Sequence, residues 1–504
     1  MKRLTMLATA ISLSVALLAG TGSAASASSS SDYNTGYTLG HQAYEYGLPL
    51  LDTQRVFDTQ TSVNISDHSG DGPVNQFNSL PHLAMPTASQ QTVVAPNDDT
   101  LYSMAWLDLR HGPQVIHVPA IKHRFYVIPL YTPWSENFYN ITSQHVAHAA
   151  GAGSYGITHG GNWAVVPPHF HGELPRGVKR IDSPYTRVWI IGRTEISGKS
   201  DTAAVDKIQH KYTITPLSKY GQHYTPKTPR HAKRKLTIAT IPGTQPGQDP
   251  LQFYTALGRE LNMFGPEPGD HTLLAQLRAI DVGPGLDPAT DPNLSAATLQ
   301  GMRDAVTQGP ANLQKELTQL YISNASTHNG YLTIDTGNYG TNYQLRALVD
   351  KVGLGALRND IATYPIAQTD RSLHPLTGTS SYVVHIPAGQ LPPVTGFWSL
   401  TMYDSNGFFV PNPLHRYVIN DRSKLHHNPD GSIDIYIQQT KPTNPQQAQN
   451  WLPTPAGAFH LIWRLYGLKP NALPGVIQGT GWTPAAIQPC TAGRGAQLMT
   501  TCAS

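Results

Sequence analysis

The residues best suited to chemistry are acids in the stretch 95–110. Asp98 and Asp99 lie in a polar turn, and Asp108 ends the alternating segment that follows. Two carboxylates that flank a substrate can act as general acid and general base. The sequence predicts this role for Asp99 and Asp108. The candidate substrate-binding residues of the stretch are Asn97, Tyr102 and Trp106.

A second group of candidates lies near the C-terminus, where Asp404 follows an alternating segment and begins an Asp-Ser-Asn-Gly turn. Arg416 is suited to hold a carboxylate through two hydrogen bonds. If two domains face each other, Asp404 joins the catalytic acids, and aromatic rings provide a stacking surface. The binding residues of this group are Trp398, Tyr403 and Arg416.

Each of these residues also has a structural interpretation. Asp98, Asp99 and Asp404 occur in turns, where Asp side chains commonly bond the backbone. The aromatic residues fit a hydrophobic core equally well. A salt bridge from Arg416 to Asp404 or Asp434 is the alternative to ligand binding.

The sequence predicts no histidine metal centre and no bound cofactor. His169 and His171 are followed too closely by Glu173 for a jelly-roll metal motif, and two prolines precede them. Calcium on Asp67, Asp71 or the Asp98–Asp99 pair is the one metal alternative. No nucleotide-binding motif is present, which leaves nucleotide, nicotinamide and flavin chemistry without support.

Composition indicates many short strands and turns. Charged residues make up 13% of the chain, and it contains 44 Gly and 41 Pro. The net charge of +3 argues against a nucleic-acid surface, because such domains usually carry a clustered basic face. We expect a small-molecule or carbohydrate ligand as partner, and the sequence leaves the oligomeric state open.

The N-terminus resembles a secretory signal peptide. A basic start precedes an apolar stretch, and Ala25-Ser26-Ala27 offers a cleavage site. Polar residues interrupt the apolar stretch, which argues against a stable membrane span. We therefore expect a secreted or extracytoplasmic protein, in which Cys490 and Cys502 form a disulfide that closes a small loop.

The pattern predicts a mainly β protein with β-sandwich or jelly-roll-like domains and a helical connecting segment. Short β-like runs separated by Gly and Pro precede residue 220, helical spacing follows residue 250, and alternation returns near residue 381. The expected order is a signal peptide (1–27), a Ser-rich spacer (28–36), an N-terminal β-rich domain (37–220), a linker (221–250), a helical connecting region (251–370), a C-terminal β-sandwich (371–485) and a tail with the cysteine pair (486–504).

Several motifs resemble known families. The run Pro96-Asn97-Asp98-Asp99-Thr100-Leu101-Tyr102-Ser103 is similar to domain of unknown function 1254. The run Phe397-Trp398-Ser399-Leu400-Thr401-Met402-Tyr403-Asp404 and the later Asn450-Trp451-Leu452-Pro453 resemble its usual companion, domain of unknown function 1214. The resemblance implies a two-domain, largely β protein that is commonly exported. It implies no settled activity and supplies no catalytic residues.

Two functions follow as hypotheses. The first is a hydrolase-like or lyase-like enzyme that binds a small polar or carbohydrate substrate between its two β domains. The second is a non-catalytic exported protein that binds a glycan, a ligand or an envelope component. The position of the 95–110 stretch relative to the strand 398–404 discriminates between them.

Overall fold

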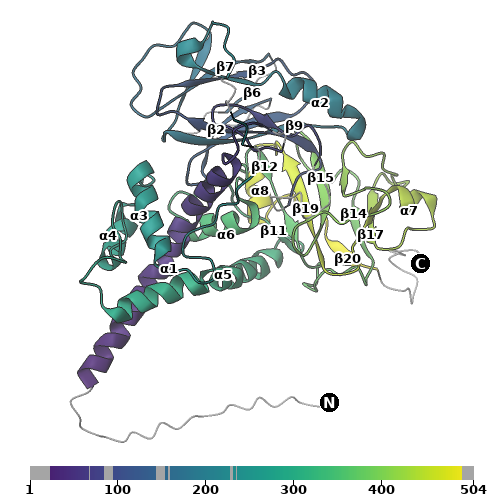
Figure 1. Ribbon diagram of the computed structural model, residues 1–504. Coiled ribbons are helices and arrows are strands. Elements are labelled where there is room, and N and C mark those ends of the chain that lie inside the picture. The colour runs from purple at the N-terminus through teal and green to yellow at the C-terminus, as the bar shows by residue number, and fades with distance from the viewer. Residues whose placement is uncertain are drawn as a thin grey trace, which may run out of the picture.

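The computed structural model describes residues 23–66, 69–83, 95–143, 154–156, 159–226, 231–233 and 235–490 (Figure 1). It contains four sheets and a group of helices. The prediction of a mainly β protein with a helical segment is confirmed. Most of the expected signal peptide lies outside the described residues, as do Asp67 and Cys502. The signal peptide and the disulfide therefore stay predictions.

The N-terminal domain is a sandwich of two sheets with orders β1-β2-β9-β4-β5-β6 and β10-β3-β7-β8. The alternation of β2 explains its packing, because Ala105, Leu107 and Leu109 face the second sheet and are buried against Ile116 and Trp163. The helix α2 (Thr202–Gln209) precedes the last strand. The strands are β1 (Asn78–Ser79), β2 (Thr100–Asp108), β3 (Gln114–Val118), β4 (Tyr126–Tyr131), β5 (Asn137–Thr142), β6 (Ser154–Gly156), β7 (Gly161–Val166), β8 (Val178–Asp182), β9 (Arg187–Glu195) and β10 (Thr213–Pro216).

The C-terminal domain is a second sandwich, with sheet orders β11-β13-β19-β15-β16 and β18-β17-β14-β20, and β12 pairs with β19. Trp398, Leu400 and Met402 of β15 face its core, as their alternation predicts. Its strands are β11 (Tyr331–Leu332), β12 (Ala362–Thr363), β13 (Ile366–Ala367), β14 (Tyr382–Ile386), β15 (Trp398–Asp404), β16 (Val418–Asn420), β17 (Ile433–Gln438), β18 (Trp451–Pro453), β19 (Phe459–Tyr466) and β20 (Ile487–Pro489). Two short helices, α7 (Pro445–Gln449) and α8 (Leu473–Gln478), flank these strands.

The long helices pack together beside the two sandwiches (Figure 1). They are α1 (Ser23–Gln60), α3 (Gln252–Phe264), α4 (His271–Leu277), α5 (Ala296–Ala325) and α6 (Tyr343–Gly353). Buried residues of α1, including Tyr44 and Leu51, share one core with the later helices. Helix α1 therefore belongs to the helical group and not to the N-terminal β domain. Among the described residues, no helix has the length and apolar character needed to cross a bilayer.

Three local expectations are wrong. Residues 28–36 belong to α1 and form no spacer. The sequence pattern predicts two helices over 295–306 and 312–321, separated by Gly309-Pro310, but α5 runs through both stretches and contains Pro310. Packing of α5 against α1 outweighs the local preference for a break. The turn at Asp404 predicts a hairpin with a second strand at 408–410, but no strand forms there, and β15 pairs with β16 and β19.

The candidate site at the domain junction

The two sandwiches meet through the sheet faces that point away from their own cores. Strand register places Tyr102 opposite Arg193 on the N-terminal sheet, and Ser399 opposite Arg464 on the C-terminal sheet. The turn 95–99 lies between these faces, because its residues bond to both. The stretch on which the sequence hypothesis rests is thus part of the domain junction.

Asp99 is fully buried and bonds across the junction. Its Oδ1 accepts hydrogen bonds from the Asn420 amide and from Nη2 of Arg422, each at 2.8 Å. Its backbone N–H donates to Oδ1 of Asn97 at 2.7 Å, so Asn97 makes the turn-stabilising bond expected of an Asp. Because Asp99 Oδ2 is also buried and has no hydrogen-bond partner in the described part, this carboxylate depends on its cross-domain partners.

The backbone of the turn is held by residues of β15 and β19. Tyr403 is buried, and its hydroxyl donates to the Pro96 carbonyl. Nη2 of Arg464 donates to the Ala95 carbonyl at 2.8 Å and to the Tyr403 hydroxyl at 2.7 Å. The Asn97 amide donates to the Tyr466 hydroxyl at 2.7 Å. Three side chains of the C-terminal sheet therefore fix the backbone that carries the two acids.

Asp98 has a different environment from its neighbour. It is half-buried, and no hydrogen bond joins its carboxyl group to another residue of the described part. Burial and the nearby charge of Asp99 raise the pKa of Asp98 to about 7, although Lys199 and Arg464 oppose the rise. Asp98 can therefore be either protonated or ionised near neutral pH.

Arg422 joins the domains at the edge of the junction. Besides Asp99, its guanidinium contacts Glu195 at 3.2 Å and Asp421 at 2.8 Å. It also lies over the ring of Phe397, 4.6 Å from the centroid. Burial raises the pKa of Asp421 to about 6, with Glu195 and Asp99 adding to the rise. Three carboxyl groups around one guanidinium make this edge acidic.

The interior of the junction holds a second buried guanidinium. Nη1 and Nη2 of Arg193 donate to the carbonyls of Ile191 and Gly355 at 3.0 and 3.1 Å. No carboxylate of the described residues lies within ion-pair distance of Arg193 or Arg464. Their positive charges are surrounded instead by tyrosine side chains, namely Tyr102, Tyr131, Tyr364, Tyr403 and Tyr466. Of these, Tyr102 and Tyr364 are half-buried, so solvent reaches this layer at its edge.

Asp108 does not join Asp99. It ends the nine-residue strand β2 that Asp99 precedes, about 30 Å away at the rise of an extended strand. There it forms an ion pair with Arg110 at 2.6 Å, and hydrogen bonds from Arg110 lower the pKa of Asp108. It also lines a separate hollow of about 90 Å³ with Phe57 and Phe264 among others. The structure therefore does not form the predicted Asp99–Asp108 acid–base pair.

Asp404 and Arg416 have structural contacts. Oδ1 of Asp404 accepts from the backbone N–H groups of Asn406 and Phe408 at 2.9 Å each, which is the turn interpretation. Nη1 of Arg416 donates to the carbonyls of Gln449 and Trp451. Among the described residues Arg416 forms no salt bridge to Asp404 or Asp434, and its role in holding a ligand carboxylate stays a prediction.

The predicted aromatic surface is divided between two cores. Trp106 is 3% exposed, stacks on Trp189 at 5.1 Å, and donates its N–H to Gln60 of α1. Trp398 is buried in the C-terminal sandwich, 5.4 Å from Trp463. Only Tyr102 and Tyr403 of the predicted aromatic residues lie at the junction. The second face of β2 is therefore buried, because α1 and the C-terminal domain cover it.

Two of the residues proposed for calcium, Asp71 and Asp99, have other partners, and Asp67 lies outside the described residues. Oδ2 of Asp71 accepts a hydrogen bond from the Ser69 hydroxyl at 3.0 Å. Oδ1 of Asp99 forms an ion pair with Nη2 of Arg422. Within the described residues, three side chains with metal-ligand spacing occur elsewhere, at His41, Glu45 and Glu316.

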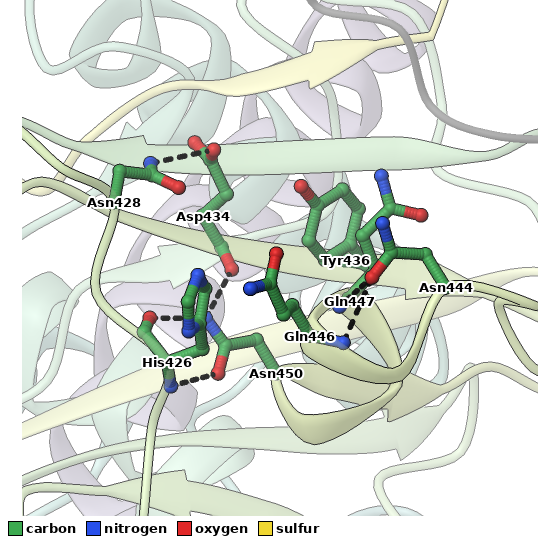
Figure 2. A pocket seen from close by; sticks show the side chains of 8 residues that line it. All are labelled: His426, Asn428, Asp434, Tyr436, Asn444, Gln446, Gln447 and Asn450. Carbon is green, nitrogen blue, oxygen red and sulfur yellow. Dashed lines mark hydrogen bonds between the residues drawn. The ribbon is translucent and has the colours of Figure 1, made fainter.

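A polar pocket lies in the C-terminal sandwich, beside β17 and α7 (Figure 2). Its cavity measures about 90 Å³. Amide side chains dominate the lining, and Oε1 of Gln447 is buried without a hydrogen-bond partner in the described part. Asp434 accepts from the Asn428 amide at 2.9 Å on one side. The lining residues are His426, Asn428, Asp434, Tyr436, Asn444, Gln446, Gln447 and Asn450.

Sequence reasoning missed Asn420, Arg422 and Glu195 as partners of the acidic turn. Asn420 ends β16, Arg422 lies in the polar turn that follows it, and Glu195 ends β9. No local pattern marks them, because their role depends on contacts over more than 200 residues of sequence.

Comparison with known proteins agrees with this architecture. Residues 74–216 match the family described as "Protein of unknown function (DUF1254)", and residues 361–470 match "Protein of unknown function (DUF1214)". The chain is a two-domain protein of these families. The first match covers the strands of the N-terminal sandwich, and the second covers those of the C-terminal sandwich except β11 and β20.

Two solved structures are similar to the chain. The VPA0106 protein from Vibrio parahaemolyticus is 22% identical, with a TM-score of 0.60 over 90% of this chain and 100% of its own, which supports the fold. A putative uncharacterized protein from Burkholderia cenocepacia is 13% identical, with a TM-score of 0.39 over 92% of this chain and 96% of its own. No curated protein matches the chain.

Proposed function

We propose that the chain is an acid–base enzyme of the hydrolase or lyase type, acting on a small polar substrate at the domain junction. One observation carries the proposal. Asp98 is a half-buried carboxyl group without a hydrogen-bond partner in the described part, directly beside the fixed and buried carboxylate of Asp99.

The proposed roles follow from the two environments. Asp98 is the proton carrier, because a group with a pKa of about 7 can both donate and accept a proton at neutral pH. Asp99 is a positioning residue, since its charge raises the pKa of Asp98 and its oxygen is bonded by Asn420 and Arg422. Tyr102, half-buried at the edge of the tyrosine layer, contacts the substrate.

The test is a screen of the mature protein against esters, glycosides and hydroxy acids, followed by variants. Asp98→Asn should reduce kcat about a hundredfold or more, as removal of a general acid–base group does, while the Tm does not fall. The matched control is Asp108→Asn, which alters an acid at the far end of β2 and should leave kcat unchanged. A turnover that survives Asp98→Asn would refute the assignment.

A second candidate function is glycan binding, and the pocket of Figure 2 favours it. Amide groups offer both donors and acceptors, which suits the hydroxyl groups of a sugar. The buried and unpartnered Oε1 of Gln447 is an available acceptor there. Titration with mono- and disaccharides tests this function, and Gln447→Leu should abolish any binding seen.

Export is part of the proposal. Its support is the basic and apolar N-terminal sequence that ends in Ala25-Ser26-Ala27. Expression of the full chain in a bacterial host should give an extracytoplasmic product whose N-terminus is Ser28. A cytoplasmic product that retains Met1 would contradict it.

A further inference from the structure

A second group of reactive side chains lies in the helical group, away from the junction. His41 and Glu45 are one helical turn apart on α1, and Glu316 comes from α5. Nε2 of His41 is 3.6 Å from Glu45 Oε1 and 3.4 Å from Glu316 Oε1. A hydrogen bond joins the two carboxyl groups, and Gln344 of α6 bonds to Glu45. Three helices therefore bring one imidazole and two carboxylates to one point.

The spacing of these atoms fits a tetrahedral metal. Zinc binds His nitrogen and carboxylate oxygen at about 2.0–2.2 Å, so two ligands at the tetrahedral angle lie about 3.3–3.6 Å apart. The two measured separations, 3.4 and 3.6 Å, fall in this range. The shorter separation of about 3.0 Å between neighbouring ligands of octahedral magnesium or manganese fits less well. One donor atom from each of the three residues lies within 4.8 Å of the others.

Each of the three residues also has one buried side-chain atom that no hydrogen bond from the described residues satisfies. Nδ1 of His41, Oε1 of Glu45 and Oε2 of Glu316 are buried and have no hydrogen-bond partner in the described part. No Lys or Arg of the described residues forms an ion pair with either carboxylate. The hydrogen bond between the two carboxyl groups requires a proton on one of them, and a bound divalent ion would take the place of that proton.

A metal ion could reach the side chains of His41, Glu45 and Glu316 from solvent. The side chains of His41, Glu45 and Glu316 are 22%, 12% and 21% exposed, so the site opens to solvent on one side. We propose that His41, Glu45 and Glu316 bind one zinc ion, with water or another small ligand in the fourth position. The metal would tie α1 to α5, because it takes ligands from both helices. This proposal is independent of the function proposed for the junction.

The test uses the mature full-length chain, stripped of metal with a chelator and titrated with zinc chloride by calorimetry. We expect one zinc ion per chain and a Tm that rises as zinc is added, because the ion binds the folded state. X-ray absorption of the zinc complex should show only nitrogen and oxygen ligands, at about 2.0–2.2 Å.

Variants connect the binding to these residues. His41→Gln and Glu316→Gln should each weaken zinc binding by more than about a hundredfold, since even residues that only orient metal ligands cost 10–100-fold. Glu316→Gln should still fold, because it removes a charge from a crowded pair. The matched control is His210→Gln, which alters an exposed His–Asp pair one turn apart on α2.

Two results would overturn the proposal. One is the absence of saturable zinc binding, or tighter binding of calcium than of zinc, by the stripped wild-type chain. The other is a Glu316→Gln variant that folds, as judged by circular dichroism, and still binds zinc with the wild-type affinity.

Discussion

Replacement of Arg422 by Gln should weaken the link between the two domains. The guanidinium is the cationic partner of Asp99, whose side chain is 0% exposed, while that of Arg422 is 20% exposed. Removing one partner of a buried ion pair typically costs about 3–5 kcal/mol, since the other charge stays buried without compensation. Because solvent reaches Arg422, we expect the low end, about 3 kcal/mol. Asp99→Asn in the same chain should recover roughly 2 kcal/mol of this loss, since the amide carries no charge.

The assay is urea unfolding, followed by tryptophan fluorescence, of both single variants and the double variant. The matched control is Arg110→Gln, whose ion pair with Asp108 has the same kind of partners but an arginine side chain that is 67% exposed. Exposed pairs contribute about 0–1 kcal/mol, so this control should unfold almost as the wild type does. An Arg422→Gln variant as stable as the control would refute the reasoning, and so would additive effects of the Arg422 and Asp99 substitutions.

Three further predictions concern the junction and the helical group. Tyr403→Phe should cost about 1–3 kcal/mol in urea unfolding, because it removes a buried hydroxyl that donates to a carbonyl and accepts from Arg464; an unchanged midpoint would contradict this. Asp98 has a pKa raised from 3.8 to about 7 in the folded state, so the folded protein holds this proton more tightly and loses stability as the pH rises through that window. Asp98→Asn should therefore raise the Tm relative to wild type at pH 8 more than at pH 4, and an equal difference at both pH values would argue against it. A Cβ at Gly309 would lie 2.4 Å from a tyrosine ring of α1, so Gly309→Ala should lower the Tm, whereas Gly353→Ala, with open space around it, should not.

The sequence predicts what depends on local pattern. The alternation in β2 identifies the face that carries Leu107, since side chains of a strand alternate regardless of what covers them. The Asp-Ser-Asn-Gly turn at Asp404 forms as its composition indicates. The strand pattern likewise predicts both sandwiches, because each buries one alternating face per sheet.

Contacts between distant segments are not predictable in this way. Trp106 was expected on an open aromatic surface, yet its ring stacks on Trp189 and its N–H bonds to Gln60 of α1. Helix α5 continues through Pro310 because α1 packs along it, which no window around Pro310 can indicate. The same limit applies to the acids. Asp98 and Asp99 are adjacent residues of the same type. Their environments differ only because the C-terminal domain packs against the turn.

The contacts at the junction also explain why the acidic turn needs both domains to form the proposed site. In the N-terminal domain by itself, Asp99 would lose the hydrogen bonds of Asn420 and Arg422, and the turn would lose those of Tyr403 and Arg464. Each of these bonds is made by the C-terminal sheet or the turn that follows β16. A free Asp99 in water would hold its charge without help and would no longer be fixed beside Asp98. The raised pKa of Asp98 that the proposed chemistry needs therefore depends on both domains being docked, and any activity of the turn should be lost when the C-terminal domain is removed.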